Sequence, residues 1–267
     1  MSRWSFGLLG VVLQACCGLA AAESCPEPLR IGFSDRAVPP GLLGHGSQFA
    51  DPPGWAVIAV REALRRLDCQ AELVRLPARR LSVALAQGDV HFALVYGVTP
   101  ERLRIYAFPM DAQGRPDPAW AVAFGHLALF GRPGTRPHPD WDGTQLPTRS
   151  RVGVLSGTLQ ETLARDRGWA VEPIMSFDSE IAMLNAQRFD VLLTVREGLT
   201  PEQRAELVEW TPGVALQPYF APATPAFAQR HGAWTRAFWV ELCQAVRQQD
   251  ADIRPVDCGV VPAAPRR

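Results

Sequence analysis

The sequence contains no lysine. All 27 positively charged side chains among its 267 residues are arginines, and 27 acidic residues balance them to a formal net charge of zero. A chain without excess positive charge does not indicate nucleic acid or an anionic membrane as a partner. An anion-binding site in this chain would be built from arginine or from backbone N–H groups.

Patterns typical of metal centres and of nucleophilic catalysis are also missing. No CxxC pair and no cluster of His and Cys has the spacing of metal ligands. The five histidines are scattered along the chain. The sequence also lacks a Gly-x-Ser-x-Gly turn, an HExxH helix and a Cys/His pair at a usable spacing. These absences predict a protein that has no metal, needs no cofactor and is not an enzyme.

A long apolar run occurs only at the N-terminus. "WSFGLLGVVL" follows the basic start "MSR" and is too short to cross a bilayer. An A-x-A cleavage site at Ala20–Ala22 comes next, so we expect residues 1–22 to be a signal peptide for export to the periplasm. Alternatively, "LQAC" resembles a bacterial lipobox, which would make Cys16 a lipidated N-terminus. Gln14 fits that motif poorly, so simple cleavage is favoured.

Four cysteines remain after cleavage, at positions Cys25, Cys69, Cys243 and Cys258. An even number in an oxidising compartment predicts two disulfides, with three possible pairings. The first two cysteines each precede a strand expected in the same sheet, and the last two flank the end of the last helix. We therefore expect Cys25–Cys69 and Cys243–Cys258, with free buried thiols as the alternative.

Hydrophobic periodicity predicts alternating strands and helices. The expected strands are 29–34, 71–76, 90–96, 121–132, 151–157, 171–177 and 189–195. The expected helices are 55–67, 78–88, 158–168, 179–188, 200–210 and 234–248. Strand–helix alternation is typical of a parallel sheet with covering helices, and here the pattern occurs twice. It therefore predicts two α/β lobes around a cleft, where the carboxyl ends of the strands bind ligands.

The segment "GVTPERLRIYAFP" begins a helix directly after an apolar strand. Thr99 fits the N-cap, Pro100 fits the first helical position, and Glu101 complements the positive helix end. "TPEQ" at 200–203 opens an ordinary amphipathic helix in the same way, so the motif alone is also explained by capping. The position after a buried strand favours a second interpretation, in which Arg102 faces the cleft and binds a carboxylate.

Five segments together resemble bacterial extracellular solute-binding proteins of family 3, and the resemblance covers about residues 29–248. The segments are "LRIGFS", "GWAVIAVREALRRL", "LAQGDVHFALVYGVTPERLRIYAFP", "RVGVLSGTLQET" and "LNAQRFDVLLTV". The resemblance implies a two-lobed type II periplasmic-binding-protein-like α/β fold, each lobe a mostly parallel sheet flanked by helices, with a cleft between the lobes. Lobe 1 would comprise residues 24–120 and 212–267, and lobe 2 residues 121–211. Strands near Phe124 and Tyr219 would form the hinge.

The resemblance also implies roles for particular residues. In that family the arginine matching Arg102 binds the α-carboxylate of the ligand, assisted by backbone at the helix start around Gly97 and Thr99. The turn containing Gly157 and Thr158 closes on the same carboxylate from lobe 2. Aromatic walls are common in such clefts, and the candidates here are Phe33, Trp55 and Tyr96. For Phe33 and Trp55, core packing is an equally good explanation.

Two positions depart from the pattern of amino-acid receptors. Val195 stands where an Asp usually holds the ligand's ammonium group, and Leu159 stands where a small hydroxyl residue is common. An ammonium group without a partner in a closed cleft is costly. Either Asp35, just past the first strand, supplies a replacement carboxylate, or the ligand has no ammonium group.

These observations predict a monomeric periplasmic receptor that captures a small carboxylate-bearing solute, an amino acid or a related compound, by closing two lobes. Its partner would be an ABC-type permease in the inner membrane. Two alternatives stay open. The first is a sensory or accessory binding protein that is not tied to a transporter. The second is an enzyme on the same scaffold similar to cyclohexadienyl dehydratase, for which Val195 occupies the expected place of the acidic residue.

Overall fold

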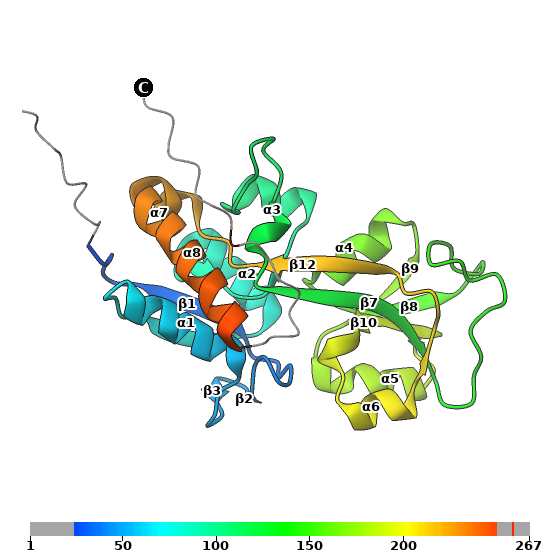
Figure 1. Cartoon of the computed structure of the whole chain (residues 1–267). Coiled ribbons are helices and arrows are strands. Elements are labelled where there is room, and N and C mark those ends of the chain that lie inside the picture. The colour runs from blue at the N-terminus through cyan, green and yellow to red at the C-terminus, as the bar shows by residue number, and fades with distance from the viewer. Residues whose placement is uncertain (1–23, 250–257, 259–267) are drawn as a thin grey trace, which may run out of the picture.

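The computed structural model describes residues 24–249 and 258. The expected signal peptide and Cys16 lie outside the described residues. Two groups of helices and strands lie at opposite ends of the molecule (Figure 1). Two long antiparallel strands, β7 (Ala123–Gly131) and β12 (Ala215–Phe220), run between these groups. They pair near Phe124 and Tyr219, the positions expected for the hinge.

The first lobe contains a parallel sheet of order β4-β1-β5. Its strands are β1 (Arg30–Ser34), β4 (Glu72–Leu76) and β5 (Phe92–Ala93). Helices α1 (Trp55–Arg66) and α8 (Gly232–Gln249) pack together on it, and apolar side chains such as Phe92 and Phe238 fill the core between these elements. The remaining elements are β2 (Gly44–His45), β3 (Gln48–Phe49), α2 (Ala78–Gln87), α3 (Pro100–Ile105) and α7 (Pro225–Arg230).

The second lobe is built on the sheet that contains the two crossing strands. The order of this sheet is β6 (Tyr96–Gly97), β12, β7, β10 (Val191–Val195), β8 (Arg151–Leu155) and β9 (Ala170–Ile174). Strands β8, β9 and β10 are parallel to their neighbours in this group, whereas β7 is antiparallel to β10. The bounds are β8 (Arg151–Leu155), α4 (Leu159–Asp166), β9 (Ala170–Ile174), α5 (Glu180–Asn185), β10 (Val191–Val195), α6 (Pro201–Glu206) and β11 (Val208–Glu209).

Most of the expected elements are present, with ends that differ by a few residues, and the two main departures concern residues 90–96 and 200–210. The strand expected over 90–96 is divided into β5 and β6 (Tyr96–Gly97), because Val95 has a positive φ of 58° and turns the chain away from the first sheet. Strand β6 then pairs with β12 instead. The helix expected over 200–210 ends at Glu206, after which β11 pairs with β7.

Both expected disulfides are confirmed. Cys25 is bonded to Cys69, and Cys243 is bonded to Cys258. Within the described residues, no helix combines the length and apolarity needed to cross a membrane.

The two sheets and the helices that flank them give the fold class expected from the sequence. The residue boundaries of the two lobes stay a prediction.

Candidate ligand-binding cleft

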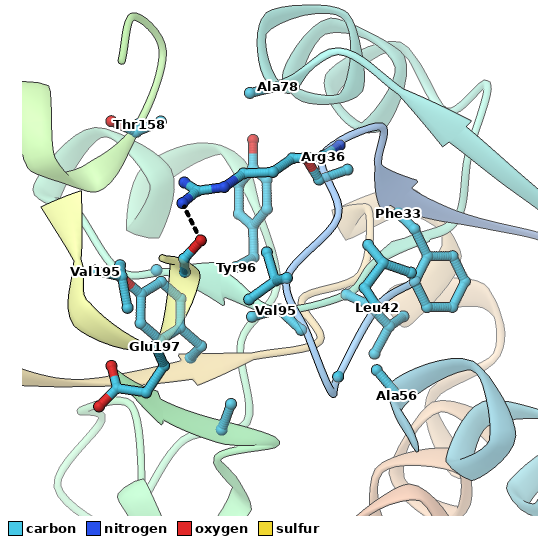
Figure 2. Close-up of a pocket in the computed structure, with 18 of the residues that line it drawn as sticks. Phe33, Arg36, Leu42, Ala56, Ala78, Val95, Tyr96, Thr158, Val195 and Glu197 are labelled. Atoms are coloured by element: carbon cyan, nitrogen blue, oxygen red, sulfur yellow. Dashed lines mark hydrogen bonds between the residues drawn. The ribbon is translucent and has the colours of Figure 1, made fainter. Parts of the chain in front are cut away.

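A cavity of about 300 Å³ lies between the two lobes and is lined by both of them. Figure 2 shows how side chains from the first lobe, such as Phe33 and Leu42, face Val195 and Thr158 of the second. Most of the lining residues are apolar, and two of the polar ones are arginines, Arg36 and Arg102. The cavity therefore combines an apolar body with a small number of strong hydrogen-bond donors.

Arg102 is held at the start of α3 by the local sequence. The Thr99 hydroxyl caps the helix by accepting from the Arg102 backbone N–H at 3.1 Å. The guanidinium donates to the carbonyl of Gly97 at 2.8 Å and to the carbonyl of Gly157 in the second lobe at 2.9 Å. It also lies over the Tyr96 ring, 4.0 Å from its centre. These contacts fix the plane of the guanidinium, and its other N–H groups remain available to a carboxylate.

In the turn before α4, a backbone N–H group is already hydrogen-bonded to a side-chain carboxylate of the protein. The Gly157 N–H donates to Glu161 at 2.8 Å. The Thr158 hydroxyl donates to the carbonyl of Leu155 at 2.6 Å and caps the helix. Gly157 and Thr158 both line the cavity, as the sequence predicts, but Glu161 uses the Gly157 N–H that was expected to help hold a ligand. Arg102 is therefore the principal hydrogen-bond donor for a bound anion at this end of the cavity.

The other sequence-predicted residues lie in different surroundings. Tyr96 lines the cavity, and its hydroxyl forms a short hydrogen bond with the Ser82 hydroxyl. Phe33 also lines it but is only 1% exposed and packs edge-on against Phe49, so it is mainly a core residue. Asp35 does not line this cavity. It borders a neighbouring one, and its backbone carbonyl accepts a hydrogen bond from Arg75 at 2.8 Å.

Arg75 is a buried arginine that the sequence-based prediction overlooked. It is 3% exposed and donates to four backbone carbonyls, those of Ser34, Asp35, Leu43 and Gln48. Ser34 ends β1, and the other three carbonyls belong to the segment between β1 and α1, which forms one wall of the cavity. An arginine between the apolar residues Val74 and Leu76 of β4 is the signal that could have identified it.

Arg36 is a second overlooked residue, and it reaches from the first lobe to the second. Its guanidinium donates to the Gly198 carbonyl at 3.0 Å and lies 3.0 Å from the centre of the Phe177 ring. Figure 2 shows this side chain extending across the cavity, with the bond to Gly198 dashed. Burial lowers the pKa of Arg36 to about 10, so the side chain stays positively charged at neutral pH.

Glu180 is a buried acid beside Arg36. Its side chain is 1% exposed, and neither carboxylate oxygen has a hydrogen-bond partner among the described residues. Burial raises the pKa of Glu180 from 4.5 to about 7, although the charge of Arg36 acts in the opposite direction. Because the folded state holds the proton more tightly than the unfolded state, the contribution of Glu180 to stability is greatest below pH 4.5 and is lost as pH rises through 7.

The position expected for an ammonium-binding acid is apolar. Val195 and the Tyr219 ring pack together beside Gly125. A Cβ atom added to Gly125 would lie 2.9 Å from Cγ1 of Val195 and 2.8 Å from Cε2 of Tyr219. Glu197 is the only acid among the described residues that line the cavity. Its carboxylate accepts from the backbone N–H of His126 at 2.9 Å and contacts Nδ1 of the same residue, and Figure 2 shows it directed away from the cavity.

No family model matches the chain, and no curated protein matches it. Solved structures do match. The GluR0 ligand-binding core from Nostoc punctiforme in complex with L-glutamate has a TM-score of 0.65 and 14% identity, over 85% of this chain and 100% of that chain. A histidine kinase sensor domain with similarity to periplasmic binding proteins has a TM-score of 0.64 and 16% identity, over 83% and 95%.

The truncated, arginine-bound ArgBP from T. maritima is also similar, with a TM-score of 0.60 and 16% identity, over 83% of this chain and 96% of that chain. At these identities the similarity concerns the fold. The resemblance to family 3 as a sequence family stays a prediction. The element order, the two crossing strands and the structural neighbours together identify the chain's architecture as the two-lobed type II periplasmic-binding fold.

Proposed function

We propose that the protein is a periplasmic receptor that captures a small carboxylate-bearing solute between its two lobes. The observation that carries this proposal is the position of Arg102. Its guanidinium lies at the cavity and contacts carbonyls of both lobes, those of Gly97 and Gly157. Two of the structural neighbours are complexes with arginine and glutamate, which are small solutes of this kind.

Binding of the solute would be coupled to closure of the lobes. A carboxylate held by Arg102 would lie beside the Gly157–Thr158 turn of the second lobe, since both border the same cavity. A ligand that contacts both lobes favours the closed arrangement over an open one, because only the closed arrangement offers all of its contacts. Leu159 of the second lobe already packs directly against Gly97 of the first.

The charges in the cavity favour binding over catalysis. The enzyme considered for this scaffold would need a carboxylate directed at the ligand for proton transfer. Glu197 is the acid nearest to this role among the described lining residues, and its carboxylate is engaged with His126 away from the cavity. We therefore infer a non-catalytic protein that delivers its solute to an ABC-type permease. A sensory role is the second candidate, because a histidine kinase sensor domain is among the structural neighbours.

A thermal-shift screen of the protein against amino acids, 2-oxo acids, dicarboxylates and small peptides tests this proposal. A ligand that binds only the native state raises the melting temperature by mass action. We expect one class of carboxylate to give a clear rise, and mass spectrometry of the incubated compound to show that it is unchanged. No rise with any class would refute the proposed carboxylate binding, and conversion of the bound compound would indicate the enzyme instead.

A further inference from the structure

The cavity carries an excess of positive charge. Arg36 and Arg102 both line it, and the carboxylate of Glu197, the only acid among its described lining residues, is directed outwards to His126. An ammonium group in this cavity would lie near two guanidinium groups and would find no carboxylate to replace its hydration. Like charges in a partly buried site repel strongly, because the surrounding dielectric screens them less than water does.

The Tyr219 hydroxyl is a buried polar group without a partner. The residue is 8% exposed, lines the cavity, and its hydroxyl has no hydrogen-bond partner among the described residues. The ring packs beside Val195, so the hydroxyl-bearing side chain occupies the region where an ammonium-binding acid was expected. A buried hydroxyl without a partner is costly, and a ligand that supplies one would remove that cost.

Tyr219 acts as a hydrogen-bond donor in this setting. Burial raises the pKa of Tyr219 well above its usual value, although the charges of Arg36 and Arg102 act in the opposite direction. The hydroxyl therefore keeps its proton at neutral pH. Arg102 donates to the carbonyl of Gly97, and Gly97 is the ladder partner of Tyr219, so Arg102 and Tyr219 border the same end of the cavity. This arrangement suits two adjacent acceptor groups on one ligand.

The rest of the lining is apolar. It is formed by aliphatic and aromatic side chains from both lobes, among them Leu42, Trp55, Leu81, Leu94, Phe124, Leu155 and Leu159. Apolar lining of this kind gains free energy by covering apolar ligand surface, and it offers little to a polar ligand body. The ligand body that fits is therefore a branched aliphatic or aromatic group, with its polar atoms gathered at the end near Arg102 and Tyr219.

We infer that the ligand is a 2-oxo acid with an apolar body, its carboxylate held by Arg102 and its 2-oxo oxygen accepting from Tyr219, and that the matching 2-amino acid is excluded. This inference rests on the proposed function and specifies its solute. Replacing the oxo group by an ammonium group would turn an acceptor for Tyr219 into a cation beside Arg36 and Arg102. Removing the oxo group would leave the carboxylate contact but not the contact with Tyr219.

Calorimetric titration with three acids that share one carbon skeleton tests the inference. The probes are 4-methyl-2-oxopentanoate, 4-methylpentanoate and L-leucine. We expect the 2-oxo acid to bind most tightly and the unsubstituted acid more weakly. L-leucine should bind about tenfold or more below the 2-oxo acid, the size of one lost hydrogen bond to a buried group. Phenylpyruvate, 3-phenylpropionate and L-phenylalanine form a second series with the same expected order.

Tyr219→Phe removes the hydroxyl and keeps the ring. We expect this variant to bind 4-methyl-2-oxopentanoate and 4-methylpentanoate equally. Tyr106→Phe is the matched control, because the Tyr106 hydroxyl donates to the Ser82 carbonyl and does not border the cavity. It should keep the preference for the 2-oxo acid. A preference that survives in Tyr219→Phe would overturn the assigned role of Tyr219.

Val195→Asp provides an independent gain-of-function variant. A carboxylate at this position would offer the ammonium group the partner that it lacks, and we expect the preference to shift towards L-leucine. If the unaltered protein binds L-leucine as tightly as the 2-oxo acid, the inference fails and the proposed function stands. If no acid of either series binds, while another class of carboxylate raises the melting temperature, the inference alone fails. If no carboxylate of any class binds, both fail.

Discussion

Replacing Gly97 with alanine would obstruct the contact between the lobes. Gly97 lies in β6 of the first lobe, and Leu159 is the first residue of α4 in the second. A Cβ atom at position 97 would lie 2.7 Å from Cδ2 of Leu159 and 3.0 Å from its Cβ. The first contact is with a flexible methyl group, which can rotate away, but the second is with an atom fixed to the backbone. The closed arrangement must therefore strain or open slightly.

The cost of this substitution follows from its overpacked geometry. Inserting a methyl group into a well-packed contact costs about 1–3 kcal/mol. The contact joins the two lobes, so the cost falls on the closed arrangement and not on the fold of either lobe. A penalty of that size on the binding-competent arrangement weakens ligand affinity by about 5- to 150-fold. The melting temperature of the ligand-free protein should change little.

Calorimetry with 4-methyl-2-oxopentanoate and small-angle X-ray scattering of the same samples would measure both effects. Leu159→Gly is the matched second variant, because it removes both the Cδ2 at 2.7 Å and the Cβ at 3.0 Å. In a double-mutant cycle, Gly97→Ala should be much less harmful in the Leu159→Gly background than alone. Unchanged affinity and an unchanged radius of gyration in Gly97→Ala would show that the two residues do not meet when ligand is bound.

Three further predictions concern stability. Glu180→Gln should stabilise the protein above neutral pH by up to about 3 kcal/mol, measured by urea unfolding, and the free energy of unfolding should vary less between pH 4.5 and 7. The exposed control Glu206→Gln should keep the original pH dependence of the unfolding free energy. The same pH dependence in Glu180→Gln would contradict the assignment. Joint replacement of Cys25 and Cys69 by serine should cost about 4 kcal/mol in the same assay, since the disulfide spans 44 residues; a loss within error would contradict this. Arg75→Lys should speed hydrogen exchange over residues 34–50, because an ammonium group cannot serve four separated carbonyls; exchange at the original rate would refute that role.

Local patterns were sufficient to predict most of the fold. Alternating strands and helices are set by periodicities of apolar residues within a few turns, and the N-cap at Thr99 is a local signal as well. The division of the strand over 90–96 was not predictable in this way. It depends on the positive φ of Val95 and on the pairing of β6 with β12, which is distant in sequence.

The candidate site was predictable only where its residues have local signatures. Arg102 stands in the first turn of a capped helix after a strand, and this position predicted that it faces the cavity, which it lines. Arg36 has no such signature, because its partner Gly198 lies 162 residues away in the sequence. The burial of Glu180 and the unpartnered hydroxyl of Tyr219 likewise arise from packing between distant segments. Asp35 seemed a suitable carboxylate by its place after β1, but the structure places it beside a neighbouring cavity.

The most direct test of carboxylate capture by Arg102 is the dissociation constant of 4-methyl-2-oxopentanoate, measured by calorimetry for the unaltered protein, Arg102→Ala and Arg104→Ala. Arg104 is an exposed arginine on the same helix, so it controls for the loss of a positive charge. Two charge-assisted hydrogen bonds are worth about 1.5–3 kcal/mol each, so Arg102→Ala should weaken binding by about 100-fold or more. Arg104→Ala should bind as the unaltered protein does. Equal binding by all three proteins would contradict the role of Arg102 as the carboxylate anchor.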